Sequence, residues 1–176
     1  MKAYSQDVKI DFEKVTDTIA TFERTLVTPS AYDDFLNGDN SALNQAEKDG
    51  LKTFIDKGCV SCHTGISLGQ SMNAMNVTAT YKYQDVGDFK GDVNGLVKVP
   101  TLRNITQTAP YFHNGQVWNL KEAIIEMGRI QLGAKLTDKE ATSIETFLKA
   151  LEGRKPALVM PMLPASTDKT PQPNMN

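Results

Sequence analysis

The only two cysteines of the chain lie in the segment Cys59-Val60-Ser61-Cys62-His63. The spacing Cys-x-x-Cys-His is the attachment signature of a c-type haem. Each thiol can add to a vinyl group of the porphyrin, and the imidazole of His63 can then bind the iron as its proximal ligand. Because such a haem is large and apolar, the segment predicts a fold in which helices pack around one macrocycle.

Two other interpretations of this segment are weaker. A thioredoxin-like redox pair also has the spacing Cys-x-x-Cys, but it occurs in a βαβ setting that this sequence does not show. A structural zinc site needs four ligands, and His113 is the only other histidine in the chain. Covalent haem attachment is preferred because it uses both cysteines together with the histidine that follows them.

Length and charge restrict the remaining function classes. The 176 residues suit one domain with appendages, and 40% of them are hydrophobic. A formal charge of −2 gives no support for nucleic acid or a membrane surface as partner. The first residues lack the apolar core of a signal peptide. Haem attachment takes place outside the bacterial cytoplasm, so we expect a periplasmic location, reached through an export signal that was cleaved or belongs to a longer chain.

Hydrophobic periodicity predicts an all-α fold. Apolar residues spaced by three and four positions from Phe12 to Leu26 predict an amphipathic helix that ends before Pro29. A short helical turn is expected at 30–36. Side chains that can cap free backbone N–H groups predict three further helices, which start after Asn44, Asn119 and Thr137.

Two segments show no regular period. Residues 64–99 are rich in Gly, Asn and Asp, and a long irregular stretch in a compact domain often wraps a cofactor. We therefore expect this stretch to shield one edge of the haem. Residues 154–176 are rich in proline and predict an extended C-terminal arm.

The ligand on the second axial position of the iron decides the chemistry. A sulfur ligand raises the reduction potential and closes the site, whereas an open position admits oxygen or peroxide. For any single methionine, filling the core is the common alternative role. Spacing favours Met127 only slightly, because it lies at a helix end before Gly128. The candidates are Met72, Met75, Met127, Met160, Met162 and His113.

Several segments in order resemble the bacterial di-haem cytochrome c peroxidases. They are Val99-Pro100-Thr101-Leu102-Arg103-Asn104-Ile105, Pro110-Tyr111-Phe112-His113-Asn114-Gly115 and Met127-Gly128-Arg129-Ile130-Gln131-Leu132. Ala20-Thr21-Phe22-Glu23-Arg24-Thr25-Leu26 is similar to the junction between the two haem domains of that family. The resemblance extends to about Gly153. Most family members have aspartate at the position of Asn114, so this chain lacks one charge there.

The resemblance implies which half of the family this chain corresponds to. In the family, peroxide is cleaved at the N-terminal haem, while the C-terminal haem has His-Met ligation and accepts electrons from a small cytochrome or cupredoxin. This chain matches the C-terminal half, which implies His63 and Met127 as axial ligands and implies that the peroxidatic haem is missing. We therefore expect an electron-transfer unit. Its own enzymatic activity is uncertain, and the alternative is a peroxidase that works through an opened haem site or an oligomer.

The same resemblance implies an organisation and partners. It predicts an inter-domain helix segment at 1–28, a cytochrome c-type haem domain at 29–153 and the arm at 154–176. If the stripe that contains Phe12, Ile19 and Phe22 is exposed, it can pack on the peroxidatic haem domain of a longer chain or on a second copy. An open haem that binds a small gas is a third and weaker hypothesis.

Four further residues are candidates for the site, and the resemblance suggests roles for three of them, Thr108, Pro110 and His113. The carbonyls of Thr108 and Pro110 correspond to ligands of a calcium ion, although they supply too few oxygens alone. The alternative is that Pro110 is a turn residue. His113 either couples the two haem sites or is structural. Arg103 either neutralises a haem propionate or lies on a solvated loop.

Overall fold

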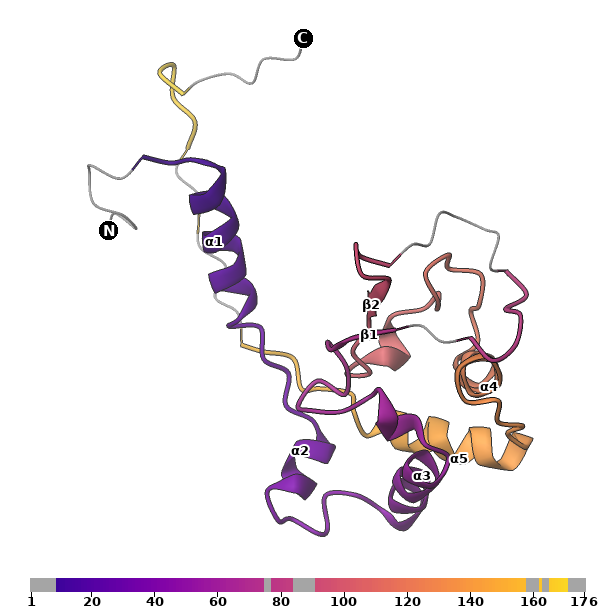
Figure 1. Ribbon diagram of the computed structural model, residues 1–176. Coiled ribbons are helices and arrows are strands. Elements are labelled where there is room, and N and C mark those ends of the chain that lie inside the picture. The colour runs from indigo at the N-terminus through magenta and orange to yellow at the C-terminus, as the bar shows by residue number, and fades with distance from the viewer. Residues whose placement is uncertain (1–8, 75–76, 84–90, 158–161, 163–164, 171–176) are drawn as a thin grey trace.

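The computed structural model describes residues 9–74, 77–83, 91–157, 162 and 165–170, so Met75 and Met160 lie outside the described residues. The described part is mostly helical, with one small sheet (Figure 1). Its helices are α1 (Phe12–Glu23), α2 (Ala31–Leu36), α3 (Gln45–Asp56), α4 (Leu120–Leu132) and α5 (Asp138–Lys149). Two short 3-10 helices are η1 (Cys59–Ser61) and η2 (Ile105–Gln107), and the strands are β1 (Met72–Ala74) and β2 (Leu96–Lys98).

The helix starts follow the caps that the sequence predicts. The side chain of Asn44 accepts a hydrogen bond from the backbone N–H of Glu47, and the Glu47 carboxylate accepts one from the N–H of Asn44. Thr137 caps α5 in the same reciprocal way, and Asn119 caps α4. Each cap satisfies N–H groups that have no partner inside the helix, which is why these starts are visible in the sequence.

Helix α4 continues past Gly128, although the sequence predicts a helix end at Met127. Gly128 is buried, and a Cβ at this position would lie 3.0 Å from a terminal carbon of Leu136. The helix ends at Gly133, which has a left-handed backbone with φ +60°. Close packing against Leu136 therefore outweighs the low helix propensity of Gly128.

The core lies between α3 and α5. Gly50 lets the two helices approach closely, because a Cβ there would lie only 2.2 Å from the carbonyl oxygen of Ser143. Phe54 of α3 and Phe147 of α5 are both buried, with their ring centroids 5.4 Å apart. The helix that leads into the Cys-x-x-Cys-His segment is thus held against the last helix of the fold.

The irregular stretch contains a short antiparallel sheet that periodicity did not predict. Strands β1 and β2 pair with Met72 opposite Lys98, and Gln70 donates its N–H to the carbonyl of Val99 at 2.7 Å. Three-residue strands are too short to show a period of two in the sequence. The pairing brings residues 68–70 against residues 99–100.

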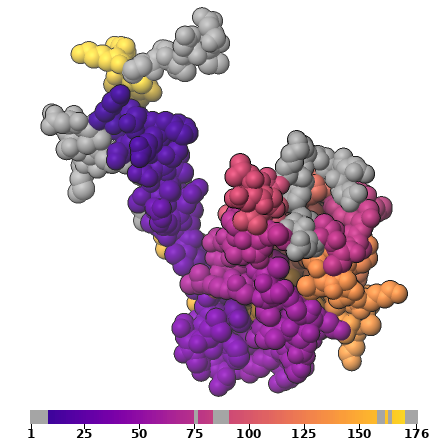
Figure 2. All heavy atoms as spheres, viewed as in Figure 1, coloured from indigo at the N-terminus to yellow at the C-terminus, as the bar shows by residue number. Residues whose placement is uncertain are grey.

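Helix α1 projects from the rest of the molecule (Figures 1 and 2). None of its residues is buried, and the exposed fraction of Phe12 is 83%. The apolar side chains of α1 are therefore not buried against any other described segment. No helix among the described residues combines the length and the apolar character needed to cross a membrane.

Candidate haem site

The end of α3 leads directly into the turn that carries the cysteines. Gly58 has a left-handed backbone with φ +84°, which favours glycine. The N–H of Ser61 then bonds the carbonyl of Gly58, and the N–H of His63 bonds the carbonyl of Cys59. This compact turn places Cys59, Cys62 and His63 on one short segment, and all three are half-buried.

A backbone carbonyl orients the imidazole of His63. Nδ1 of His63 lies 3.0 Å from the carbonyl oxygen of Leu68, so Nδ1–H is the donor in this contact. Nε2 then carries the lone pair with which a neutral histidine binds a metal. Burial lowers the pKa of His63, and the hydrogen bond to Leu68 opposes this shift only in part. The neutral, metal-binding form is therefore favoured.

The environment of the cysteines does not match a redox pair or a zinc site. Burial raises the pKa of the Cys59 thiol, whereas the nucleophilic cysteine of a thioredoxin-like pair has a lowered pKa. Among the described residues, no three His, Cys, Asp or Glu side chains gather closely enough to hold a metal ion. Both alternative interpretations of the motif therefore lose support.

Half-buried apolar side chains border the core, and two of them, Cys59 and Val60, belong to the turn. They pack against the core cluster of α3 and α5 and include Cys59, Val60, Leu102, Ile105, Leu120 and Ile124. These residues come from η1, from the segment around η2 and from the start of α4. This partly buried apolar set, which includes Cys59 itself, fits a macrocycle that is mostly apolar.

Met127 lies on the inner face of α4. It is half-buried and shares a helix face with Ala123 and Ile130, which are both buried. In contrast, Met72 and Met162 are exposed. Met127 is thus the most enclosed of the methionine candidates that the structure describes. Its role as the axial ligand stays a prediction.

Two buried polar atoms have no hydrogen-bond partner within the described part of the chain. They are Oγ1 of Thr106 and Nε2 of Gln131, and Gln131 lies one helical turn after Met127. An unpaired buried donor lowers the stability of the fold by about 1–3 kcal/mol. A polar group of a bound cofactor could accept its hydrogen bond and remove this cost. The propionates of a haem are such groups, and the residues present therefore fit a haem in both apolar and polar respects.

Arg103 is neither solvated nor free. Its Nη1 and Nη2 lie 2.7 Å and 2.6 Å from the two carboxylate oxygens of Asp33, and its Nε donates to the carbonyl of Ile66 at 2.6 Å. Only 15% of the Arg103 side chain is exposed. The alternative of an arginine on a solvated loop is wrong. Contact with a haem propionate stays a prediction, and a propionate would share the guanidinium with Asp33.

The other residues that the sequence singled out lie on the segment before α4. Thr108, Pro110 and His113 are all exposed, and the ring of His113 is 6.3 Å from that of Tyr81. Nδ2 of Asn114 donates to the carbonyl of Tyr83 at 2.8 Å, while its Oδ1 accepts from the Tyr81 hydroxyl at 3.2 Å. The amide at position 114 thus uses a donor that an aspartate would lack. The calcium site and the coupling role of His113 stay predictions.

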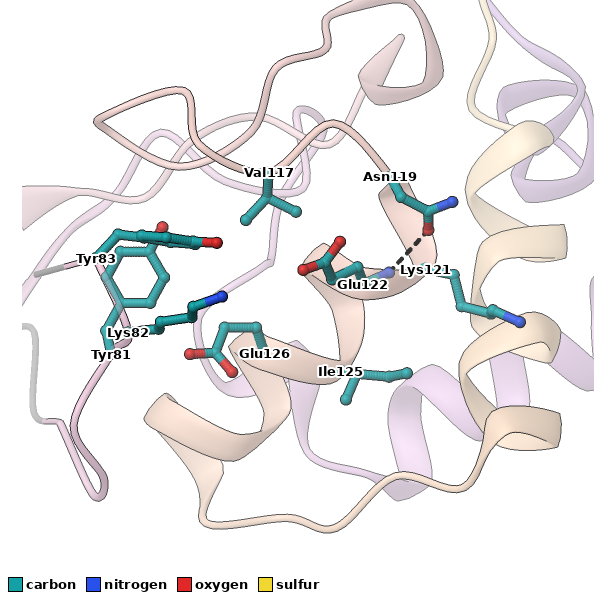
Figure 3. Close-up of a pocket in the computed structure, with 9 residues that line it drawn as sticks. All are labelled: Tyr81, Lys82, Tyr83, Val117, Asn119, Lys121, Glu122, Ile125 and Glu126. Atoms are coloured by element: carbon teal, nitrogen blue, oxygen red, sulfur yellow. Dashed lines mark hydrogen bonds between the residues drawn. The ribbon is translucent and has the colours of Figure 1, made fainter.

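A separate pocket of about 240 Å³ lies on the outer side of α4 (Figure 3). Ile125 lines it, and Ile125 leaves the helix in nearly the opposite direction to Met127, two positions later. Its charged lining mixes both signs, with Lys82 and Lys121 beside Glu122 and Glu126. This pocket is therefore distinct from the candidate haem site.

Sequence reasoning missed three residues that shape the site: Asp33, Leu68 and Thr101, whose hydroxyl donates to the carbonyl of Ser67 at 2.6 Å. Leu68 contributes a backbone carbonyl, so its side chain carries no signal of that role. Asp33 is visible in the sequence only as the last residue of a capping box that begins at Ser30. A contact with an arginine far along the chain has no local signature.

Comparisons with known proteins agree with this site. A model of the cytochrome c family matches residues 47–152. The chain is 41% identical to a cytochrome c551 peroxidase of Nitrosomonas europaea over 97% of this chain and 53% of the relative. It is 40% identical to a cytochrome c551 peroxidase of Pseudomonas aeruginosa over 93% of this chain and 51% of that protein. The chain thus spans about half the length of these two relatives.

One solved structure shows the same fold. The crystal structure of a MauG-like protein associated with microbial copper homeostasis superposes with a TM-score of 0.63. The match covers 84% of this chain and 55% of that protein, at 24% sequence identity.

Proposed function

Because this chain belongs to the cytochrome c family, we propose that it transfers electrons through one covalent c-type haem, with His63 and Met127 as the axial ligands of the iron. The observation that carries this proposal is the orientation of His63, whose Nδ1 is held by the carbonyl of Leu68. That contact leaves Nε2 as the ligating atom of an imidazole that stands directly after two half-buried cysteines.

The chain's own residues would set the properties of the site. The haem, when bound, supplies an iron that accepts and releases one electron. Cys59 and Cys62 would hold the porphyrin through thioethers, and the sulfur of Met127 would raise the reduction potential and close the distal position. His63 is itself half-buried, which limits its contact with water. A closed, six-coordinate site suits electron transfer because little has to rearrange when the charge changes.

We extend this proposal to a role in a larger system. The two relatives named above are cytochrome c551 peroxidases and are about twice as long as this chain. By analogy, the chain acts as the electron-accepting domain of a di-haem cytochrome c peroxidase that reduces hydrogen peroxide. Its electron donor is a small cytochrome c or cupredoxin, and its compartment is the periplasm. The carbonyls of Thr108 and Pro110 would supply only part of a calcium site in that longer protein, so we expect the site to be empty or weakly filled in this chain.

The exposed stripe of α1 supports a packing partner for that helix. Its large apolar side chains are exposed along more than two helical turns. An exposed apolar stripe does not stabilise a helix in water and is typical of a surface that packs on a partner. The proposed partner is the peroxidatic haem domain of a longer chain. A second copy of this chain is the alternative.

Replacement of Met127 tests the ligation. Met127→Ala should lower the reduction potential by more than about 100 mV, because changes of axial ligand shift haem potentials over several hundred millivolts. It should also remove the sulfur-to-iron absorption band. Met72→Ala is the matched control, since Met72 is exposed on β1 and should leave both signals unchanged. An unchanged potential in Met127→Ala would exclude Met127 as the ligand.

The peroxidase names of the relatives favour one second candidate, a chain that reduces peroxide by itself. Mass and a pyridine haemochrome assay give the number of haems per chain, and one is expected. A ferric protein that is fully low-spin and does not turn over hydrogen peroxide with a reduced cytochrome would exclude this candidate.

A further inference from the structure

Asp33 and Arg103 form a two-pronged ion pair that is largely shielded from solvent. Both guanidinium nitrogens Nη1 and Nη2 reach the carboxylate, at 2.7 Å and 2.6 Å, and the side chains are 21% and 15% exposed. The same carboxylate accepts the backbone N–H of Ser30 at 2.7 Å and the Ser30 hydroxyl at 2.9 Å. Asp33 is thus fixed at the start of α2, and through it the plane of the Arg103 guanidinium is fixed as well.

The remaining nitrogen of that guanidinium, Nε, points to the loop after His63. Nε of Arg103 donates to the carbonyl of Ile66 at 2.6 Å. Next to it, the Thr101 hydroxyl donates to the carbonyl of Ser67 at 2.6 Å, and the N–H of Leu102 bonds the same carbonyl at 3.3 Å. Segment 101–103 therefore holds two consecutive carbonyls of the loop. The carbonyl that follows belongs to Leu68, and it accepts the Nδ1–H of His63.

We infer that Arg103, held by Asp33, is a positioning residue that sets the orientation of the His63 imidazole through the loop 66–68. The inference rests on the proposed function, in which His63 is the proximal ligand. A partner of the non-ligating nitrogen fixes the ring plane and the basicity of a metal-bound histidine. Here that partner is a backbone carbonyl, so its position depends on whatever holds the backbone on either side. Arg103, which lies outside the loop, fixes this backbone through its hydrogen bond to the carbonyl of Ile66.

A lysine could not replace Arg103 in this role. The planar fork bonds one carboxylate with Nη1 and Nη2 while Nε bonds a carbonyl in the same plane. A lysine has one ammonium on a flexible stem and cannot hold both acceptors in a fixed mutual geometry.

The neighbouring residue offers a matched control. Asp34 lies next to Asp33 on α2 and also pairs with an arginine, with its Oδ2 2.7 Å from Nη1 of Arg154. That pair is more exposed, at 41% for Asp34 and 58% for Arg154. The Asp34–Arg154 pair lies outside the contacts that hold the loop 66–68, so Asp34→Asn removes an aspartate–arginine pair from the same helix and leaves those contacts in place.

The experiment compares Asp33→Asn and Asp34→Asn in the haem-loaded protein with two measurements. The first is hydrogen exchange at the amides of Leu68 and Gly69, which bond the carbonyls of Gly65 and Thr64. The second is the pattern of hyperfine-shifted haem-methyl NMR resonances in the ferric state, which reports the plane of the axial imidazole. Asp33→Asn should accelerate exchange about tenfold, because local opening of the loop loses charge-assisted hydrogen bonds, and should shift the methyl pattern. Asp34→Asn should change neither.

Three results would overturn the inference: no change in Asp33→Asn, faster exchange with an unchanged methyl pattern, or equal effects in both variants. If Asp33→Asn does not fold, Arg103→Lys is measured in its place, and the same signals decide. A wild-type chain that binds no haem would contradict the proposed function. A wild-type chain with intact haem and an Asp33→Asn variant without effect would contradict only this inference.

Discussion

Nδ1 of His63 lies 3.0 Å from the carbonyl oxygen of Leu68, at the start of a turn with an unusual backbone. Leu68, Gly69 and Gln70 all have positive φ angles, of 47°, 152° and 72°. Such angles are uncommon for residues other than glycine, so other contacts must hold the turn. Leu68 is buried, and Gln70 donates its N–H to the carbonyl of Val99. The carbonyl that orients the His63 imidazole therefore depends on a turn that is held by contacts with other segments.

Substitution of Gly69 should disturb this turn. A Cβ at Gly69 would lie 2.3 Å from the carbonyl oxygen of Pro100, and backbone atoms cannot yield easily. We expect Gly69→Ala to lower the free energy of unfolding by about 3 kcal/mol, at the upper end of ordinary substitutions. Denaturant unfolding followed by circular dichroism measures this change.

Gly65→Ala is the control, because Gly65 also has a positive φ of 71° but nothing lies within 4 Å of its added Cβ. It should cost only about 1 kcal/mol, from backbone strain alone. Equal losses in the two variants would mean that the contact with Pro100 does not matter.

Asn114→Asp should loosen the segment 77–83. The amide of Asn114 donates to the carbonyl of Tyr83, and a carboxylate in its place would face that carbonyl with negative charge. We expect a loss of about 1–3 kcal/mol in the free energy of unfolding at neutral pH. Thermal unfolding of the wild type and the variant measures it.

The loss should diminish in acid, because repulsion raises the pKa of the new carboxyl group and its protonated form can donate again. A difference between the two proteins that is constant from neutral to acid pH would contradict this account.

The Asp33 carboxylate should make stability sensitive to acid. Burial opposes its ionisation, but hydrogen bonds from Arg103 and Ser30 outweigh burial and lower its pKa to about 2. Because the pKa is lower in the folded state than in the unfolded state, its contribution is complete above about pH 4 and is lost as the pH falls towards 2. We expect about 1 kcal/mol after solvent screening.

The measurement is the difference in unfolding free energy between the wild type and Asp33→Asn from pH 7 to pH 2. This difference should be constant above about pH 4 and shrink below it. A hydrogen bond from Lys57 also lowers the pKa of Glu140 to about 2. The unfolding free energies of both proteins therefore still fall in acid, but by the same amount. A difference that does not shrink would show that the pair does not stabilise the fold through charge.

Helix α1 should contribute little to the stability of the haem domain. Ile19 is exposed, so Ile19→Lys should change the free energy of unfolding by less than about 0.5 kcal/mol. Ile144 is almost completely buried on α5, and Ile144→Ala should cost about 2–5 kcal/mol. If a second copy covers the stripe, Ile19→Lys will also lower self-association in sedimentation velocity. A large loss of stability in Ile19→Lys would mean that α1 packs on the domain.

Much of the fold could be predicted because its signals are local. Asn44, Asn119 and Thr137 start helices because each side chain bonds an N–H only three residues away. The resemblance to the di-haem cytochrome c peroxidases, which rested on segments from Val99 to Leu132, is confirmed by relatives at 40% identity. The short strands β1 and β2 could not be predicted, since their pairing depends on closing a loop rather than on a residue pattern.

The Cys-x-x-Cys-His segment by itself determined the cofactor class and predicted His63 as the proximal ligand, because the chemistry of two thiols and one imidazole needs only that spacing. The partners of the site were decided by the tertiary structure alone. Leu68 acts through its backbone, and Arg103 meets Asp33 from seventy positions away. A hydrogen bond of this kind forms only after the helices have packed and brought distant segments together, so no local pattern in the sequence encodes it.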